Sequence, residues 1–134
     1  MEWTCNPPKK AQIIRTKVSF YYHYGIFVSE DEVIQFGLPT DPTKPADQVK
    51  VLVTDIYTFL NGGELETAKY TAQEKLTLRK SDDIIKTARS RIGEGGYDIL
   101  HNNCEHFVND CAFGKSQSHF LDEVRQKLRQ KLAK

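Results

Sequence analysis

Apolar residues are arranged differently in the two parts of the chain. The first part has short runs that are rich in aromatic and β-branched residues, a composition that favours strands. These runs are residues 11–16, 20–28, 33–36 and 50–53. The last part instead places apolar residues at helical spacing, in residues 81–92, 104–113 and 116–134. Strands first and helices last predict an α+β fold.

The segments between these elements read as turns and short connections. The polar residues Ser29–Glu32 have the length of a hairpin turn, so we expect residues 20–28 to pair with residues 33–36. The remaining expectations are a polar lead-in at 1–10, a proline-rich loop at 38–47, a short helix from Thr54 or Asp55 to Leu60, and strand or loop at 64–71 and 75–78.

The helical segments carry recognisable start and stop signals. Ser81 is a candidate cap for the helix over 81–92, and Asn102 or Asn103 for the helix that begins at Cys104 and stops at Gly114. For the last segment we expect an amphipathic helix packed on the domain through Phe120, Leu121, Val124 and Leu128, with its basic residues in solvent. The chain is thus predicted to be one domain over 1–134, with a core over 11–114 and a C-terminal amphipathic helix over 115–134.

Composition narrows the class of protein. The chain has 19 Lys and Arg against 18 Asp and Glu, and a net charge of +1 argues against nucleic acid as a partner. We see no apolar run of about 18 residues and no signal-peptide pattern, so we expect no transmembrane segment. Three cysteines make no disulfide framework. We therefore expect a reduced, cytoplasmic protein.

Cys104 is the candidate nucleophile. It is the first residue of a predicted helix, where the helix dipole and free backbone N–H groups lower a thiol pKa from about 8.5 toward neutrality. A thiol of this kind attacks acyl groups when a histidine serves as base. The backbone N–H of Cys104, helped by Tyr21 or Tyr22, is our candidate for stabilising the oxyanion.

His23 is the candidate base, and Gln35 the candidate orienting residue. His23 lies in a strand, which is a rigid support, and Gln35 lies 12 residues later on the partner strand of the hairpin. A hydrogen bond from the His23 ring to the Gln35 side-chain oxygen fixes the tautomer, as the third member of a triad does. A lone strand histidine is more often a packing or surface residue, so this reading competes with a purely structural one.

The histidines beside Cys104 raise a second possibility. His106 follows Cys104 by two residues and points elsewhere on a helix, so it reads better as a surface or packing residue than as a base. His101, Cys104, His106 and Cys111 include enough donors to suggest zinc, but their spacing is poor for a four-ligand site. We expect no metal and no cofactor, with Cys111 a buried small apolar residue.

Several segments together resemble the lecithin:retinol acyltransferase (LRAT) domain family. They are NNCEHFV at 102–108, YYHYGIFV at 21–28, EVIQFG at 32–37 and the run ARSRIGEGGYDILHNNCEHF at 88–107. The similarity extends over about residues 11–114. It implies a circularly permuted papain-like fold, also similar to NlpC-type peptidases, in which an antiparallel sheet packs against the helix that bears the cysteine. It further implies Cys104 as nucleophile, His23 as base and a thioester intermediate.

Two features depart from the family's lipid enzymes. Those enzymes usually carry a second histidine where this chain has Gln35, and the animal members end in a transmembrane helix that we do not find here. A neutral glutamine stabilises an imidazolium less than a carboxylate does. Contact of the basic C-terminal segment with a membrane surface is the less favoured reading of that segment.

The sequence leads to one main functional hypothesis and two rivals. The main one is a thiol-dependent hydrolase or acyltransferase that takes an acyl group from an ester or amide, a phospholipid included, and passes it to water, an amine or an alcohol. A cysteine peptidase or amidase of the NlpC type would use the same residues on a peptide substrate. A non-catalytic LRAT-like module that binds a partner or a lipid is the third reading, favoured by the change at Gln35 and disfavoured by the presence of both Cys104 and His23.

Overall fold

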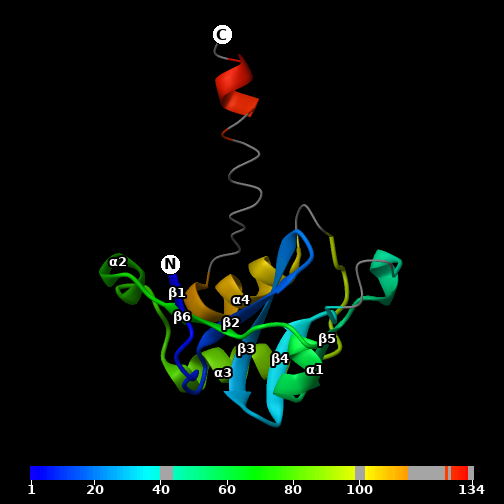
Figure 1. Cartoon of the computed structure of the whole chain (residues 1–134), viewed down its shortest axis with the longest axis vertical. Helices are drawn as coiled ribbons and strands as arrows, with labels where there is room; N and C mark the ends of the chain where they lie inside the picture. Colours follow the sequence, from blue (N-terminus) through cyan, green and yellow to red (C-terminus); the bar gives the residue numbers. More distant parts are fainter. Residues whose placement is uncertain (40–43, 99–101, 115–125, 127, 133–134) are drawn as a thin grey trace.

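One antiparallel sheet of six strands organises the protein (Figure 1). The structure is a computed structural model that describes residues 1–39, 44–98, 102–114, 126 and 128–132. The strands lie in the order β1-β6-β2-β3-β4-β5. Their bounds are Glu2–Thr4 for β1, Ile13–Val18 for β2, Tyr21–Ser29 for β3, Glu32–Phe36 for β4, Val51–Thr54 for β5 and Glu66–Lys69 for β6. The α+β class and the antiparallel sheet predicted from the sequence are confirmed.

Strand β3 is central, and its register fixes which residues share a face. It pairs with β2 so that Thr16 lies opposite His23, and with β4 so that Gly25 lies opposite Gln35. Because side chains alternate along a strand, His23, Gly25 and Gln35 share one face of the sheet. The hairpin of residues 20–28 and 33–36 is therefore confirmed, with a register that the sequence alone left open.

The helices begin at residues that cap them. Asp55 starts α1 (Ile56–Leu60), and its side chain accepts a hydrogen bond from the Thr58 N–H at 2.7 Å. Asn103 caps α4 (Cys104–Phe113), and Gly114 ends that helix in the left-handed conformation, as predicted. The other helical elements are a 3₁₀ turn η2 (Ala46–Gln48), α2 (Ala72–Lys75) with a capping box at its start, and α3 (Ser81–Ser90).

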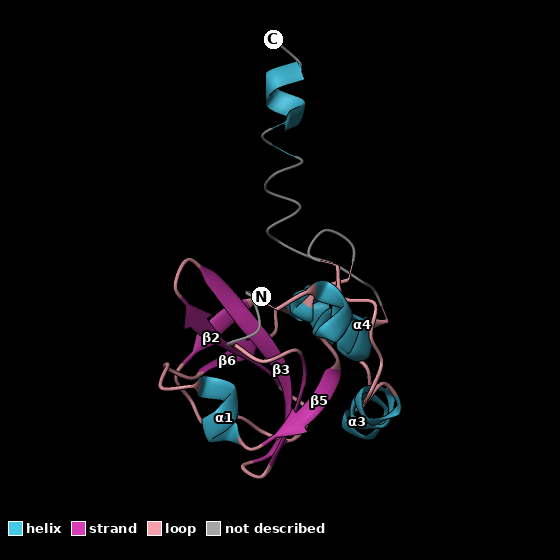
Figure 2. Cartoon of the chain, turned by 90° about the vertical axis from the view of Figure 1, so that its right-hand side faces the viewer, coloured by secondary structure: helices cyan, strands magenta, loops and turns pink. Residues whose placement is uncertain are grey.

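The sheet is covered on both faces. In Figure 2, α3 and α4 lie on one side of the strands and α1 lies on the other. The larger core lies under α3 and α4 and includes Ile13, Tyr24, Ile26, Phe36 and Phe107. The smaller core lies under α1 and consists of the buried residues Ile14, Val33, Ile56 and Phe59. Tyr24 and Ile26 thus face α4, while His23 and Gly25 face α1.

Arg15 of β2 contacts β1 and β6, which form the edge of the sheet, and β1 is a strand that the sequence did not predict. Its guanidinium lies 4.1 Å from the centre of the Trp3 ring and 3.7 Å from that of the Tyr22 ring, and its Nε donates to Glu66 at 2.9 Å. Cation–π contacts with two rings and an ion pair with a carboxylate thus connect β1, β3 and β6 to β2 through one side chain. Residues 2–4 form β1, which pairs with β6. The prediction of a polar lead-in over residues 1–10 is therefore wrong for residues 2–4.

Three further expectations need correction. The helical turn α2 was not predicted. Ser81 is the first residue of α3 rather than its cap, and the capping position is held by Lys80, without a side-chain hydrogen bond. Leu128 is 54 % exposed, so it does not pack on the domain as expected, and the helical turn at 128–132 stands away from the sheet (Figure 1). Phe120, Leu121 and Val124 lie outside the described residues.

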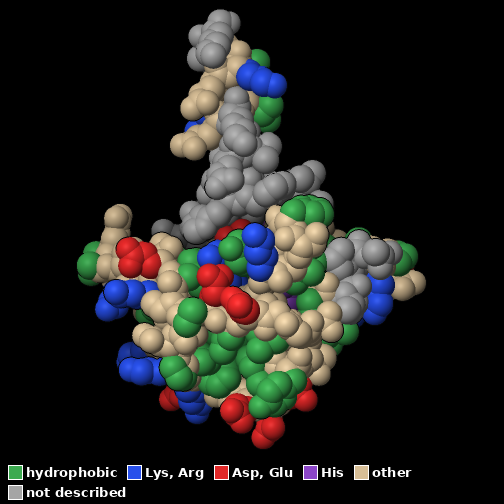
Figure 3. Space-filling view, in the orientation of Figure 1, with side chains coloured by type: hydrophobic (Ala, Val, Ile, Leu, Met, Phe, Trp, Pro, Cys, Tyr) green, Lys and Arg blue, Asp and Glu red, His purple; other side chains and the backbone are tan. Residues whose placement is uncertain are grey.

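The surface mixes charges of both signs. On the face seen in Figure 3, acidic and basic side chains lie among apolar ones, in keeping with a net charge of +1. Among the described residues, no helix has the length and apolar character needed to cross a membrane.

Thr16 generates a stability prediction. Its hydroxyl is buried on the α1 face, close to Gly63, and has no hydrogen-bond partner among the described residues. A buried polar group without a partner costs roughly 1–3 kcal/mol. We expect Thr16→Val, which keeps the shape and removes the hydroxyl, to raise the free energy of unfolding by about 1 kcal/mol in urea titrations. A lower free energy of unfolding would show that the hydroxyl is satisfied.

Candidate active site

Cys104 stands at the first turn of α4, as the sequence predicted. The Asn103 side chain accepts hydrogen bonds from the backbone N–H groups of Glu105 and His106, both at 3.0 Å. This cap uses the second and third amides of the helix and does not include the N–H of Cys104. The Cys104 N–H is thus the first-turn amide that Asn103 leaves for another acceptor.

His106 has a structural function in this turn. Its Nδ1 accepts a hydrogen bond from the Asn103 backbone N–H at 3.1 Å, which completes a reciprocal capping box. The residue is only 6 % exposed. Of the two non-catalytic readings, packing is therefore right and helix surface is wrong. Burial also fits Cys111, which is fully enclosed as expected.

The thiol of Cys104 lies against strand β3. The backbone N–H of Tyr24 hydrogen-bonds to the sulfur. Tyr24 directly follows His23, so α4 brings the sulfur to the backbone of the residue next to the candidate base. Cys104 itself is 7 % exposed and belongs to the core cluster that contains Tyr24 and Phe107. The helix and the strand thus bring the Cys104 sulfur to the backbone position that directly follows His23.

The predicted lowering of the Cys104 pKa is wrong for this state of the protein. Burial raises the pKa of the thiol from its ordinary value of 9.0 to about 11, and the nearby Glu105 carboxylate adds to the increase. Hydrogen bonds from the backbone N–H groups of Tyr24, Cys104 and Glu105 act in the opposite direction, as expected at a helix start, but do not offset the burial. The Cys104 side chain is therefore a neutral thiol, and as a candidate nucleophile it would need a base to take its proton.

His23 and Gln35 make the contact that the sequence predicted. Nε2 of His23 lies 2.7 Å from Oε1 of Gln35, and both residues are buried. The two are diagonal neighbours across β3 and β4, because Gln35 lies directly opposite Gly25. With no side chain at Gly25, the Gln35 side chain reaches across to the ring of His23.

Gly25 also makes room for the residue that holds the His23 ring. A Cβ at Gly25 would lie 2.7 Å from Cε1 of Phe59 and 3.1 Å from Cγ1 of Val33. Phe59 comes from α1, and its ring centre is 5.2 Å from that of His23. The imidazole is thus supported on one side by an aromatic ring and at Nε2 by an amide oxygen, an arrangement that leaves it little rotational freedom.

Thr54 is a site contact that sequence analysis missed. Its hydroxyl accepts a hydrogen bond from Nε2 of Gln35 at 2.6 Å and donates to the backbone carbonyl of Asp55 at 2.8 Å. The sequence indicated only that Thr54 or Asp55 begins the short helix that ends at Leu60, and this local signal says nothing about a contact with Gln35. The approach of Thr54 to Gln35 depends on the pairing of β4 with β5, where Gln35 lies opposite Leu52.

The two candidate tyrosines lie on opposite faces of β3. The Tyr21 hydroxyl donates to the Pro39 carbonyl at 3.4 Å, on the same face as His23. Tyr22 stacks on Arg15 and packs against the core cluster that contains Cys104. Of the two, Tyr22 is therefore the one that packs against the core cluster to which Cys104 belongs.

The part of the chain that the structure describes contains no group of three residues suited to a metal ion. His101, one of the four donors considered for zinc, lies outside the described residues. Cys5, Cys104 and Cys111 are all free cysteines.

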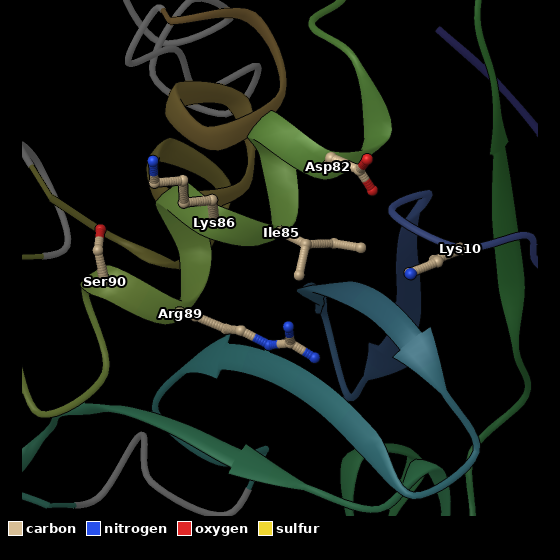
Figure 4. Close-up of a pocket in the computed structure, with 6 residues that line it drawn as sticks. All are labelled: Lys10, Asp82, Ile85, Lys86, Arg89 and Ser90. Atoms are coloured by element: carbon tan, nitrogen blue, oxygen red, sulfur yellow. The ribbon is translucent and has the colours of Figure 1, made fainter.

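A basic depression on α3 lies apart from these residues. It has a volume of about 520 Å³ and is lined by Lys10, Asp82, Ile85, Lys86, Arg89 and Ser90 (Figure 4). Arg89 makes a two-pronged ion pair with Glu32, at 2.8 Å for both hydrogen bonds, which neutralises part of its charge. Neither Cys104, His23 nor Gln35 lines this depression.

The site therefore defines an α+β protein with a cysteine at a helix start beside a strand that carries a hydrogen-bonded histidine. The family model for lecithin retinol acyltransferase matches residues 6–117, and the chain belongs to this family. The human phospholipase A and acyltransferase 2 is 26 % identical over 121 residues, with 83 % of this chain and 74 % of the relative covered. The human phospholipase A and acyltransferase 3 is 27 % identical, with 88 % and 76 % covered. Mouse lecithin retinol acyltransferase is 22 % identical, with 87 % and 61 % covered.

The buried, protonated thiols and phenols of this protein predict that the folded state becomes less stable at high pH. The pKa is raised to about 11 for Cys104 and to about 12 for Cys111 and Tyr70, in each case chiefly by burial, and it is raised for Tyr24 as well. The folded state holds these protons more tightly than the unfolded state, so stability is fully present below about pH 9 and is lost as pH rises through the folded values.

We expect the free energy of unfolding in urea to fall by several kcal/mol between pH 9 and pH 12, since a tenfold difference in proton affinity between the folded and unfolded states is equivalent to about 1.4 kcal/mol. Cys104→Ser removes one of the titrating groups, so its decline should be shallower than that of the unaltered protein. A free energy of unfolding that stays constant to pH 11 would contradict the buried, protonated thiol.

Proposed function

We propose that this protein is a thiol acyltransferase and hydrolase that takes an acyl group from a phospholipid through a thioester on Cys104. The observation that carries the proposal is the hydrogen bond between His23 and Gln35, directly beside the strand position where the Cys104 sulfur lies. The three residues come from β3, β4 and α4, so their assembly depends on the whole fold.

In the first half-reaction, His23 acts as general base. With Nε2 engaged by Gln35, Nδ1 is the ring nitrogen that takes the proton from the Cys104 thiol as the sulfur attacks the acyl carbonyl. The tetrahedral intermediate collapses to a thioester when the lysophospholipid oxygen leaves. That oxygen takes the proton from the His23 ring, so the ring ends this step neutral.

In the second half-reaction, the same ring serves the acceptor. A water, alcohol or amine gives its proton to Nδ1 of His23 and attacks the thioester carbonyl. The Cys104 sulfur leaves and recovers the proton from the ring, which restores the resting thiol. Water as acceptor gives a fatty acid, whereas an amine or alcohol gives an amide or ester. The balance between hydrolysis and transfer depends on which acceptor reaches the thioester.

The raised pKa of Cys104 shapes this mechanism. A thiol with a pKa of about 11 is almost fully protonated at pH 7, so the proposed attack on the acyl carbonyl does not start from a thiolate that is already present. The thiol instead loses its proton to His23 as the sulfur attacks. The rate of this step therefore depends on the orientation of the His23 ring. Gln35 and Phe59 supply that orientation through a 2.7 Å hydrogen bond and a ring contact.

The choice of a phospholipid as acyl donor comes from the relatives. Two of them are named phospholipase A and acyltransferase, and a third is named lecithin retinol acyltransferase. Their identities to this chain are 22–27 %. The test therefore compares a phospholipid with a peptide amide as acyl donor.

The central prediction concerns covalent capture of the acyl group. Purified protein is mixed with phosphatidylcholine vesicles, and intact mass is measured alongside release of lysophospholipid and fatty acid. We expect a mass gain of one acyl group that disappears in Cys104→Ala and remains in Cys111→Ala. His23→Ala should lower turnover by about 10² to 10⁴-fold, the usual range for a general base, and Gln35→Ala by about tenfold.

The rival functions give different outcomes in the same experiment. Thioester formed from a peptide amide but not from phosphatidylcholine would replace the lipid donor with a peptidase or amidase function. No adduct from either donor, with vesicle binding retained, would favour the non-catalytic module. Equal turnover of the Cys104→Ala and unaltered proteins would rule out Cys104 as nucleophile.

A second prediction separates the oxyanion candidates. We propose the Cys104 backbone N–H as the first donor and Tyr22 as the second, because Tyr22 packs in the same cluster as Cys104. Tyr22→Phe should lower kcat about 10²-fold, the usual cost of one oxyanion donor. Tyr21→Phe, which removes a hydroxyl bound to Pro39, should change kcat by less than about threefold and serves as the control. Equal effects of the two substitutions would remove Tyr22 from this role.

A further inference from the structure

The Gln35 amide is held by a second hydrogen bond, and that bond has a consequence for His23. Nε2 of Gln35 donates to the Thr54 hydroxyl at 2.6 Å, and the Thr54 hydroxyl donates to the Asp55 backbone carbonyl at 2.8 Å. A carbonyl oxygen accepts hydrogen bonds and never donates them. The direction of each bond in this series is therefore fixed from its far end.

The directions follow one after another. Because the Asp55 carbonyl accepts, the Thr54 hydroxyl spends its only proton there and presents a lone pair to Gln35. Gln35 must then direct its NH₂ group to Thr54 and its oxygen to His23. An amide oxygen also only accepts, so Nε2 of His23 carries the hydrogen and Nδ1 is the unprotonated nitrogen of the neutral ring.

We propose that Thr54 is a positioning residue that sets the tautomer of His23 through the Gln35 amide. This inference rests on the proposed function, in which Nδ1 of His23 receives the thiol proton. Without the Thr54 hydroxyl the Gln35 amide is free to rotate by half a turn and present its NH₂ group to His23. A ring that accepts at Nε2 carries its proton on Nδ1 and has no lone pair for the thiol.

Thr54 acts through the site without touching the reacting atoms. It ends β5 and precedes Asp55, the cap of α1, whose Phe59 contacts the His23 ring. The junction of β5 and α1 thus supports the base twice, by hydrogen bonds through Thr54 and Gln35 and by a ring contact through Phe59. A charged third residue attracts the ring proton by its charge, whereas a neutral amide needs a fixed orientation to do so.

The matched control is Thr16. It is also a threonine on the α1 face beside His23, directly opposite it on β2, but its hydroxyl makes no hydrogen bond among the described residues. Thr54→Val and Thr16→Val are thus the same chemical change on strands that flank the site. Thr54→Ser restores the hydroxyl, and Thr54→Ala gives a second deletion that introduces no methyl group in its place.

The first readout is the tautomer itself, measured without substrate. Two-bond ¹H–¹⁵N correlation spectra of the histidine rings distinguish a protonated from an unprotonated ring nitrogen, and the His23 signals are identified by their loss in His23→Gln. We expect protonated Nε2 and unprotonated Nδ1 in the unaltered, Thr16→Val and Thr54→Ser proteins. Thr54→Val and Thr54→Ala should show a mixture of both tautomers. Thermal melting confirms beforehand that each variant is folded.

The second readout is the split between kcat and KM on phosphatidylcholine. Thr54→Val should lower kcat about tenfold, with KM changed less than about twofold, and Thr54→Ser should recover most of the rate. An unchanged His23 tautomer in both folded hydroxyl deletions would overturn the inference, as would an equal effect of Thr16→Val. If Cys104→Ala keeps full activity, the proposed function fails instead, and the tautomer measurement still decides the role of Thr54.

Discussion

Strand β3 packs against α4 on one face and against α1 on the other, and the rest of the structure depends on this double packing. Its even-numbered residues Tyr22, Tyr24 and Ile26 pack toward α4, while His23 and Gly25 face α1. The sulfur of Cys104 reaches the strand at the Tyr24 backbone. The candidate nucleophile and base therefore belong to different packing layers and meet at one strand. Any shift of register in β3 by one residue would exchange the two faces and separate them.

This constraint explains why a glycine and a glutamine stand where they do. Gly25 leaves space for Phe59 above the strand, and Gln35 lies directly opposite Gly25 on β4, so both contacts with the His23 ring are made next to this glycine. The resemblance to the family's lipid enzymes implies a histidine at the position of Gln35. In this chain the amide is combined with Thr54, a residue whose hydroxyl is already directed by a backbone carbonyl. The change at Gln35 is thus accompanied by a local structure that suits an amide.

Local sequence signals predicted much of this molecule, and the exceptions have a common cause. Asn103 and Gly114 bracket α4 as expected, and the turn length predicted the pairing of β3 with β4. The register that brings Gln35 to His23 was left open by the sequence. Strand β1 was missed because its partner, β6, lies more than sixty residues away. The pKa of Cys104 was predicted in the wrong direction for a related reason. The helix start is visible in the sequence, whereas the burial that outweighs it comes from tertiary packing.

The neutral state of the Cys104 thiol affects how readily its sulfur is oxidised. Peroxide and related oxidants attack the thiolate of cysteine and leave the protonated form almost untouched. A sulfur that is buried and protonated at rest is therefore shielded from sulfenic acid formation, although it stands at a helix start. Cys5, which is exposed, is the thiol that such oxidants meet first. In the proposed mechanism, the Cys104 sulfur is open to such oxidants only while His23 holds its proton, so the thiol is protected whenever no acyl transfer is under way.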